Sequence, residues 1–170
     1  LKVNFQTINL KAVEISVLKI YQNNVLQFLQ ENDLGGAYRL RRVGATIAQK
    51  VVPIQATTKN SLSKWSTHAI DLSKIITPEP GAIYRVKIDF KKEYALNCNN
   101  DKPPIKEENL LVLEEDGNSD YYDYDDYDYD YDWEERDDPC KDSYYYRKSV
   151  ETNILATDLG VVVKRGQNND

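Results

Sequence analysis

The sequence has little of the residue types that most often carry catalysis or metal binding. Its 170 residues include two cysteines, one histidine and no methionine. No apolar run approaches the roughly twenty residues that a membrane-spanning helix needs, and no signal peptide is visible. Because the chain begins at Leu1 without a methionine, we expect it to be a piece of a longer protein.

Positive charge is also sparse and scattered, so nothing in the chain is typical of a nucleic-acid surface. The net charge is −6, but residues 114–138 alone hold fourteen Asp or Glu and one Arg, which leaves +7 for the rest. Arg39, Arg41 and Arg42 are the densest basic group, and no basic run follows them. We expect no nucleic-acid partner. The arginines are interpreted as a solvated edge with ordinary ion pairs, rather than as an anion site.

Short segments of alternating apolar and polar residues predict an all-β fold. Within the segment 84–90, apolar side chains alternate with charged ones, which is typical of an antiparallel sheet with one face in water. The fold class expected is an antiparallel β-sandwich of about seven strands. Leu18 and Ile20 change parity relative to the preceding segment, which suggests a bulge or a strand end. The strands are expected near residues 3–7, 13–17, 38–43, 46–52, 65–72 and 84–90.

One short helix is predicted at residues 25–31. Asn23 and Asn24 precede it as capping residues, and Leu26 and Leu29 fall on one face of it. Further along, an apolar run at 105–113 either pairs as an extra strand or covers a sheet edge.

Two cysteines flank a long excursion from the sandwich, which we place at about 99–139. Cys98 precedes it and Cys140 follows it. We predict a disulfide between them, worth roughly 4 kcal/mol in the chain-entropy model and requiring an oxidising compartment. The alternative is two free thiols in a cytosolic protein.

The excursion contains a tract in which aspartate and tyrosine alternate. Calcium prefers several oxygen ligands from one short loop, so Asp126, Asp128, Asp130 and Asp132 are candidate ligands, although the spacing of an EF-hand is absent. A solvated acidic loop is the second interpretation. The third is a contact surface for a basic partner or a neighbouring domain.

No catalytic constellation is predicted. The single histidine, His68, shares a predicted strand face with Ile70, which is typical of a structural histidine, and no local motif supplies it with a nucleophile. Asp89 and Glu93 are close in sequence but are expected on a solvated face with no pocket. We therefore predict no catalytic residue, no cofactor and no enzymatic activity.

Several stretches of the chain carry a resemblance to a known family. The first stretches are Val3-Asn-Phe5, Val13-Glu-Ile-Ser-Val17 and Phe28-Leu-Gln30. The others are Trp65…Ile70-Asp-Leu-Ser73, Gly81–Phe90, Arg136-Asp-Asp-Pro-Cys140 and Asn153–Gly160. Through these stretches the sequence is similar to one of the N-terminal macroglobulin domains of bacterial α2-macroglobulins, and the likeness covers nearly the whole chain apart from the acidic tract.

The resemblance implies a macroglobulin or fibronectin-III-like sandwich at residues 1–157, followed at 158–170 by a final strand or a linker to the next domain. It implies a non-catalytic structural domain of a protease inhibitor that cages proteases, with neighbouring macroglobulin domains and captive proteases as partners. It also implies the bacterial periplasm or cell envelope, with a membrane anchor in a missing N-terminal region. The Cys-Gly-Glu-Gln thioester of many relatives does not occur here.

A second function remains open. The chain can instead be a stand-alone extracellular adhesion or ligand-binding sandwich that uses the Tyr/Asp loop, with calcium as a potential ligand.

Overall fold

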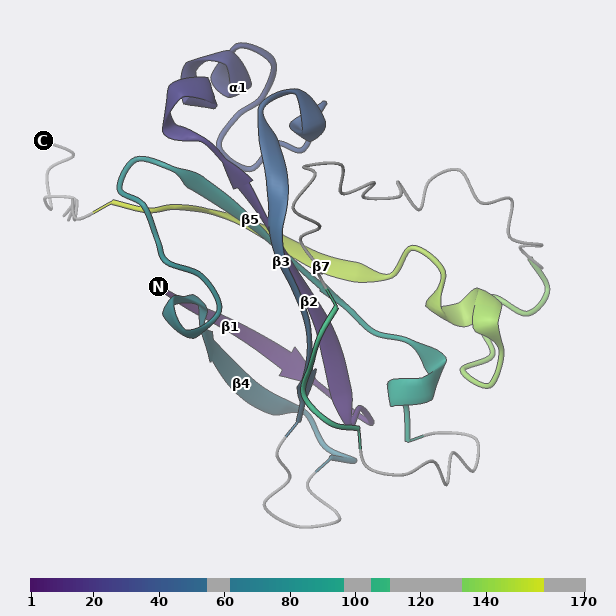
Figure 1. Ribbon diagram of the computed structural model, residues 1–170. Coiled ribbons are helices and arrows are strands. Elements are labelled where there is room, and N and C mark those ends of the chain that lie inside the picture. Colours follow the sequence, from purple (N-terminus) through teal and green to yellow (C-terminus); the bar gives the residue numbers. More distant parts are fainter. Residues whose placement is uncertain (55–61, 97–104, 111–132, 158–170) are drawn as a thin grey trace, which may run out of the picture.

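The computed structural model describes residues 1–54, 62–96, 105–110 and 133–157. Within them, two antiparallel sheets and one short α-helix form the fold that the alternating segments predict (Figure 1). The strands are β1 (Lys2–Thr7), β2 (Ala12–Ile20), β3 (Gly44–Pro53), β4 (Ser66–Asp71), β5 (Ile83–Asp89), β6 (Glu108–Asn109) and β7 (Ser149–Leu155). The larger sheet has the order β6-β3-β2-β5-β7, and the smaller one pairs β1 with β4.

The main core lies between the two sheets. Ile15 and Val17 of β2 stand opposite Ile88 and Val86 of β5, and all four are buried. Side chains from the small sheet, among them Val3, cover this face. Because each large apolar side chain that is fully buried contributes about 1.5–3 kcal/mol, this face supplies much of the stability.

A second, smaller core covers the opposite face of the large sheet at one end. Ile20 and Ile83 are cross-strand partners there, and they pack with Phe28 of helix α1 (Val25–Glu31) and with Val43. Figure 1 shows α1 at this end of the molecule. The parity change at Leu18 therefore marks a second buried surface.

The register shift does occur at this point of the sheet, but in one ladder only. It lies between Val17 and Leu18 in the pairing of β2 with β3, where Ile47 is the extra residue. The pairing of β2 with β5 stays regular to Ile20. The predicted bulge is thus confirmed on the β3 side, and the predicted strand end is wrong.

The helix is confirmed, the predicted cap is wrong, and the face that holds Leu26 and Leu29 is not the one that the helix buries. Leu26 and Leu29 are 79% and 41% exposed, whereas Phe28 is 1% exposed. Asn24 precedes the helix without capping it, because its Nδ2 donates to the carbonyl of Val43 at 2.9 Å. The side chain thus connects the helix to the segment that leads into β3.

The predicted strand at 38–43 is also wrong. Leu40–Arg42 form a 3-10 helix, preceded by Arg39 in the left-handed region at φ 51°. Leu40 and Val43 pack into the second core together, at the three-residue spacing of a helical turn. Gly44 then starts β3 so close to β2 that a Cβ atom would lie 2.3 Å from the carbonyl oxygen of Lys19.

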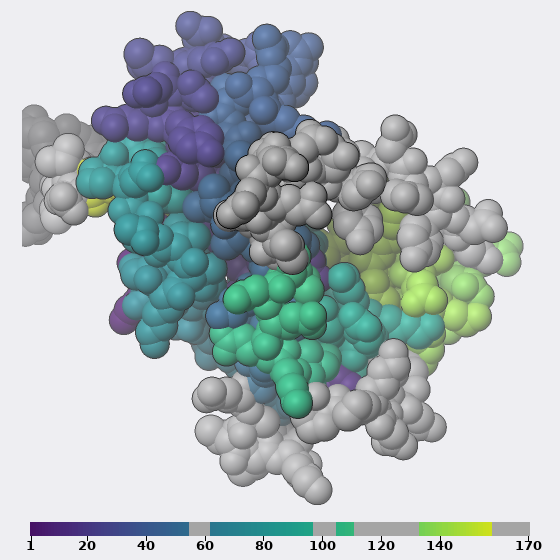
Figure 2. All heavy atoms as spheres, viewed as in Figure 1, coloured from purple at the N-terminus to yellow at the C-terminus, as the bar shows by residue number. Residues whose placement is uncertain are grey.

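The apolar run at 105–113, near the start of the excursion, contributes a short edge strand, β6. β6 pairs with Lys50 and Val51 of β3, and Ile105 and Leu110 pack over Val51 and Tyr94. Figure 2 shows residues 105–110, in green, at the surface over this end of the molecule. Of the two alternatives, pairing as an extra strand is confirmed for the described part of the run. No helix in the described ranges is long and apolar enough to cross a membrane.

Candidate functional site

A polar surface lies on the outer face of β2, β5 and β7. The antiparallel register aligns its residues in rows that cross the three strands. Such rows bring directly opposed side chains to within about 4.5–5.5 Å at their Cβ atoms. The rows are Glu14–Asp89–Ser149, Ser16–Lys87–Glu151 and Leu18–Arg85–Asn153.

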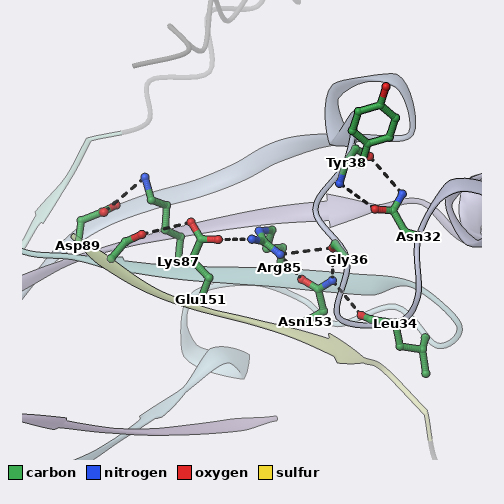
Figure 3. Close-up of polar contacts among 10 residues, drawn as sticks. Asn32, Leu34, Gly36, Tyr38, Arg85, Lys87, Asp89, Glu151 and Asn153 are labelled. Carbon is green, nitrogen blue, oxygen red and sulfur yellow. Dashed lines mark hydrogen bonds and ion pairs between the residues drawn. The ribbon is translucent and has the colours of Figure 1, made fainter. Parts of the chain in front are cut away.

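Arg85 and Asn153 form the centre of this surface (Figure 3). The Arg85 guanidinium bonds Glu151 through Nη2, and its Nη1 lies 3.0 Å from Asn153 Oδ1. Asn153 Nδ2 donates to the carbonyls of Leu34 and Gly36, at 2.9 and 2.8 Å. We call Arg85, Glu151 and Asn153 the strand clamp. It holds the loop between α1 and the 3-10 helix against the sheet.

The loop gripped by the strand clamp is itself closed by one side chain. Asn32 Oδ1 accepts from the Tyr38 amide at 2.7 Å, and its Nδ2 donates to the Tyr38 and Phe28 carbonyls, each at 3.1 Å. Figure 3 shows Asn32 and Tyr38 facing each other above the clamp. Several backbone groups of the loop are thus paired from both sides, which restrains its conformation.

Two carboxylates lie side by side in the first of these rows, and each has a lysine. Glu14 is 5% exposed; its Oε2 lies 2.7 Å from Lys91 Nζ, and its Oε1 accepts from Gln49 at 2.5 Å. Asp89 lies 3.4 Å from Lys87 Nζ. Burial raises the pKa of Asp89, the positive charge of Lys87 opposes that rise, and the charge of Glu14 adds to it.

The carboxylate that lies beside Asp89 is not Glu93, the one that is close to it in the sequence. The close partner of Asp89 is Glu14 on the adjacent strand, whereas Glu93 lies in the 3-10 helix Lys92–Tyr94 after β5. Both Glu14 and Asp89 are neutralised by lysines of the same chain. Removal of either lysine would leave a carboxylate without its cation, so the arrangement keeps the charged groups engaged with one another.

The residues after the acidic tract form a compact turn around Cys140. The Cys140 amide donates to Asp138 Oδ1 at 2.8 Å, and the Tyr145 hydroxyl donates to the Pro139 carbonyl at 2.7 Å. Tyr145 also packs edge-on against Phe90 just after β5, 5.6 Å between ring centroids. Burial raises the pKa of the Tyr145 hydroxyl. This end of the excursion is thus anchored to the sandwich.

The predicted disulfide and calcium ligands fall partly outside the described ranges. Cys140 is disulfide-bonded. Cys98 lies outside the described residues, so its pairing with Cys140 stays a prediction. Asp126, Asp128, Asp130 and Asp132 lie outside as well, and within the described part of the chain no group of three or more metal-binding side chains could hold an ion.

The other singled-out residues have local partners. His68 Nε2 lies 2.9 Å from Thr7 Oγ1, and its ring packs against Phe5 at 5.4 Å between centroids, the contacts of a structural histidine. Arg39 and Arg42 lie 3.7 and 3.9 Å from Glu31, as the solvated-edge interpretation predicts.

Comparisons with known proteins return no counterpart: no family model, curated protein or solved structure matches the chain. The strand clamp is therefore interpreted from its own geometry. Sequence reasoning did not single out Arg85 or Asn153, because their meeting depends on the register of strands 68 residues apart.

Proposed function

We propose that this chain is a non-catalytic structural domain of a bacterial α2-macroglobulin-like protease trap. The proposal starts from the family resemblance of the sequence. The observation that carries it further is the strand clamp: Arg85 belongs to the resembling stretch Gly81–Phe90, and Asn153 begins the stretch Asn153–Gly160. Arg85 and Asn153 meet in space and hold the domain's own loop.

The hydrogen bonds of Asn153 support a scaffold role. Its amide oxygen accepts from Arg85, and its amide nitrogen donates to two carbonyls of the loop. If Asn153 were to bind a ligand instead, it would first lose these hydrogen bonds, and each lost bond would cost about 1 kcal/mol of stability. Such a residue is suited to rigidity, which is what a domain that transmits position to its neighbours needs.

The expected setting follows from the same proposal. Neighbouring macroglobulin domains would contact this one, and the complete protein would enclose a protease at the bacterial periplasm or cell envelope. The disulfide at Cys140 supports an oxidising compartment of this kind.

The proposal is tested on the full-length parent protein. It is mixed with a broad-range protease and assayed with a small peptide substrate and with a large protein substrate. We expect the peptide to be cleaved at an undiminished rate and the protein substrate to be protected, because a caged protease admits only small molecules. The 170-residue chain alone is the control and should protect neither substrate.

Undiminished cleavage of both substrates by the mixture with the parent protein would contradict the trap. The ligand-binding alternative then predicts that deletion of residues 116–133 abolishes a measurable affinity of the chain, while its circular dichroism stays unchanged.

A further inference from the structure

In the described residues β1 pairs with β4 alone, and within this part of the chain its other edge is open. The Leu72 amide donates to the Leu1 carbonyl at 2.8 Å, so the odd-numbered residues of β1 bond to the even-numbered residues of β4. The backbone groups of Lys2, Asn4 and Gln6 therefore point to the other side, away from β4. An edge of this kind is a template for a further strand.

A groove with an apolar floor and polar residues at its rim lies along this open edge. It has a volume of about 310 Å³ and runs between β1 and the β5–β7 part of the large sheet. Ile88 on its floor is 6% exposed, while Val150, its direct partner on β7, is 65% exposed. An exposed valine on the core face of a sandwich marks a place where the covering layer is incomplete. The full lining is Lys2, Val3, Asn4, Phe5, Val86, Ile88, Val150, Glu151, Thr152 and Ile154.

The chain itself contains a segment with the chemistry to fill such a groove. After β7, Leu159, Val161 and Val163 alternate with Gly160, Val162 and Lys164, and β-branched residues favour strands. This alternation indicates a strand at residues 159–165, with seven residues against the six of β1. The following Gly166-Gln-Asn-Asn-Asp170 has the composition of a turn.

The same segment fits its own groove poorly. Figure 1 shows that β7 ends on the side of the molecule where β1 begins, so a strand returning from β7 would run parallel to β1. It would first have to cross the roughly 10 Å between sheets, which uses about three residues. Leu159 would then lie in the connection. A segment from another molecule or domain can instead pair antiparallel over its whole length, and antiparallel ladders are the more stable.

We propose that the groove beside β1 receives the strand Leu159–Arg165 of a neighbouring copy of this domain. The incoming strand pairs antiparallel with β1, places Leu159, Val161 and Val163 over the groove, and makes the small sheet three-stranded. This inference rests on the proposed scaffold function and deepens it: in a series of such domains, the end of one completes the sandwich of the next. The isolated chain then associates head to tail, since donor strand and groove are different surfaces.

The experiment measures the mass of the full 170-residue chain by sedimentation over a range of concentrations. The wild type should show species that grow with concentration. Val150→Glu places a charge in the groove, and Val163→Asp places one in the donor strand, so each should weaken association at least about tenfold. Leu155→Glu is the control: it alters a half-exposed residue on the opposite face of β7 and should associate as the wild type does.

A mixture of the two blocked variants gives the sharpest result. The Val150→Glu chain keeps its donor strand, and the Val163→Asp chain keeps its groove. Together they should form a one-to-one dimer and nothing larger. A synthetic peptide of residues 158–166 should also bind the Val163→Asp chain and should not bind the Val150→Glu chain.

Other outcomes would overturn the proposal. A monomeric wild type whose melting temperature falls in both blocked variants would show that the segment docks within its own chain. Association that all three substitutions leave unchanged would place the contact elsewhere. The caging assay on the parent is independent of these results, so failure of the groove proposal is distinguishable from failure of the scaffold function.

Discussion

Arg85 and Asn153 are direct cross-strand partners on β5 and β7, and their side chains meet at 3.0 Å between Nη1 and Oδ1. Through Nδ2, Asn153 reaches two carbonyls that lie 117 and 119 residues away in the sequence. One side-chain pair thus connects the last described strand to the loop that follows α1.

Replacing Asn153 by alanine should release that loop. Asn153→Ala removes two donors to the loop and the acceptor of Arg85, so we expect a loss of about 2–3 kcal/mol in the free energy of unfolding. Urea denaturation followed by circular dichroism measures it. Thr152→Ala, at an exposed residue on the groove side of the same strand, is the matched control, with an expected change below about 0.5 kcal/mol. Equal losses in the two variants would contradict the clamp.

Two adjacent lysines offer a test of buried against exposed charge pairing. Lys91 lies 2.7 Å from the buried Glu14, whereas Lys92 lies 3.4 Å from Asp142, whose side chain is 74% exposed. Lys91→Met leaves a buried carboxylate without its cation and should cost about 1–3 kcal/mol. Lys92→Met should cost less than about 0.5 kcal/mol. The same urea titration compares them, and a larger loss for Lys92→Met would show that the Glu14 pair contributes little.

Tyr94 should make the fold sensitive to alkali. Burial raises the pKa of Tyr94 from 10.0 to about 12, so the unfolded chain releases this proton at a lower pH than the folded chain does. Between these values the folded state holds more protons, and stability therefore falls as pH rises. Tyr94→Phe removes this loss, which we expect to be about 1–2 kcal/mol.

The measurement is the free energy of unfolding of both chains from pH 9 to about 12. The difference between them should change in favour of Tyr94→Phe as pH rises through this window. Parallel curves would contradict the buried hydroxyl.

The disulfide prediction can be checked directly. Alkylation of the unreduced, unfolded chain followed by mass spectrometry should find no free thiol, and peptide mapping should join Cys98 to Cys140. Reduction should lower the free energy of unfolding by up to roughly 4 kcal/mol, since the bridge would close a long loop. Two alkylated cysteines in the unreduced chain would contradict the pairing.

The strands were predictable where the pattern is local. In β5, buried Tyr84, Val86 and Ile88 alternate with half-buried charged residues, and the side-chain period of a strand makes this visible in seven residues. The strand prediction for the segment before β3 was wrong because Leu40 and Val43 pack together through a helical turn. Arg39, in the left-handed region, precedes this turn. A backbone reversal of this kind leaves little mark on hydrophobic alternation.

Neither the buried face of α1 nor the polar surface could be derived from a local pattern. Whether Phe28 or Leu29 faces the sheet depends on how α1 is oriented against Ile20, which the helix sequence does not contain. The rows across β2, β5 and β7 depend likewise on the register of three strands that are far apart in the chain. Long-range pairing decides both, so the sequence identified the elements better than their contacts.

The burial of β2 on both of its faces has a consequence for hydrogen exchange and unfolding. Eight of its nine residues are buried, on a strand that is paired on both sides. Amide hydrogens in such a strand exchange with solvent only when the whole structure opens, whereas those of edge strands exchange through local fraying. Deuterium uptake at β2 would therefore report the global free energy of unfolding, and its protection would be the last to disappear as denaturant is added.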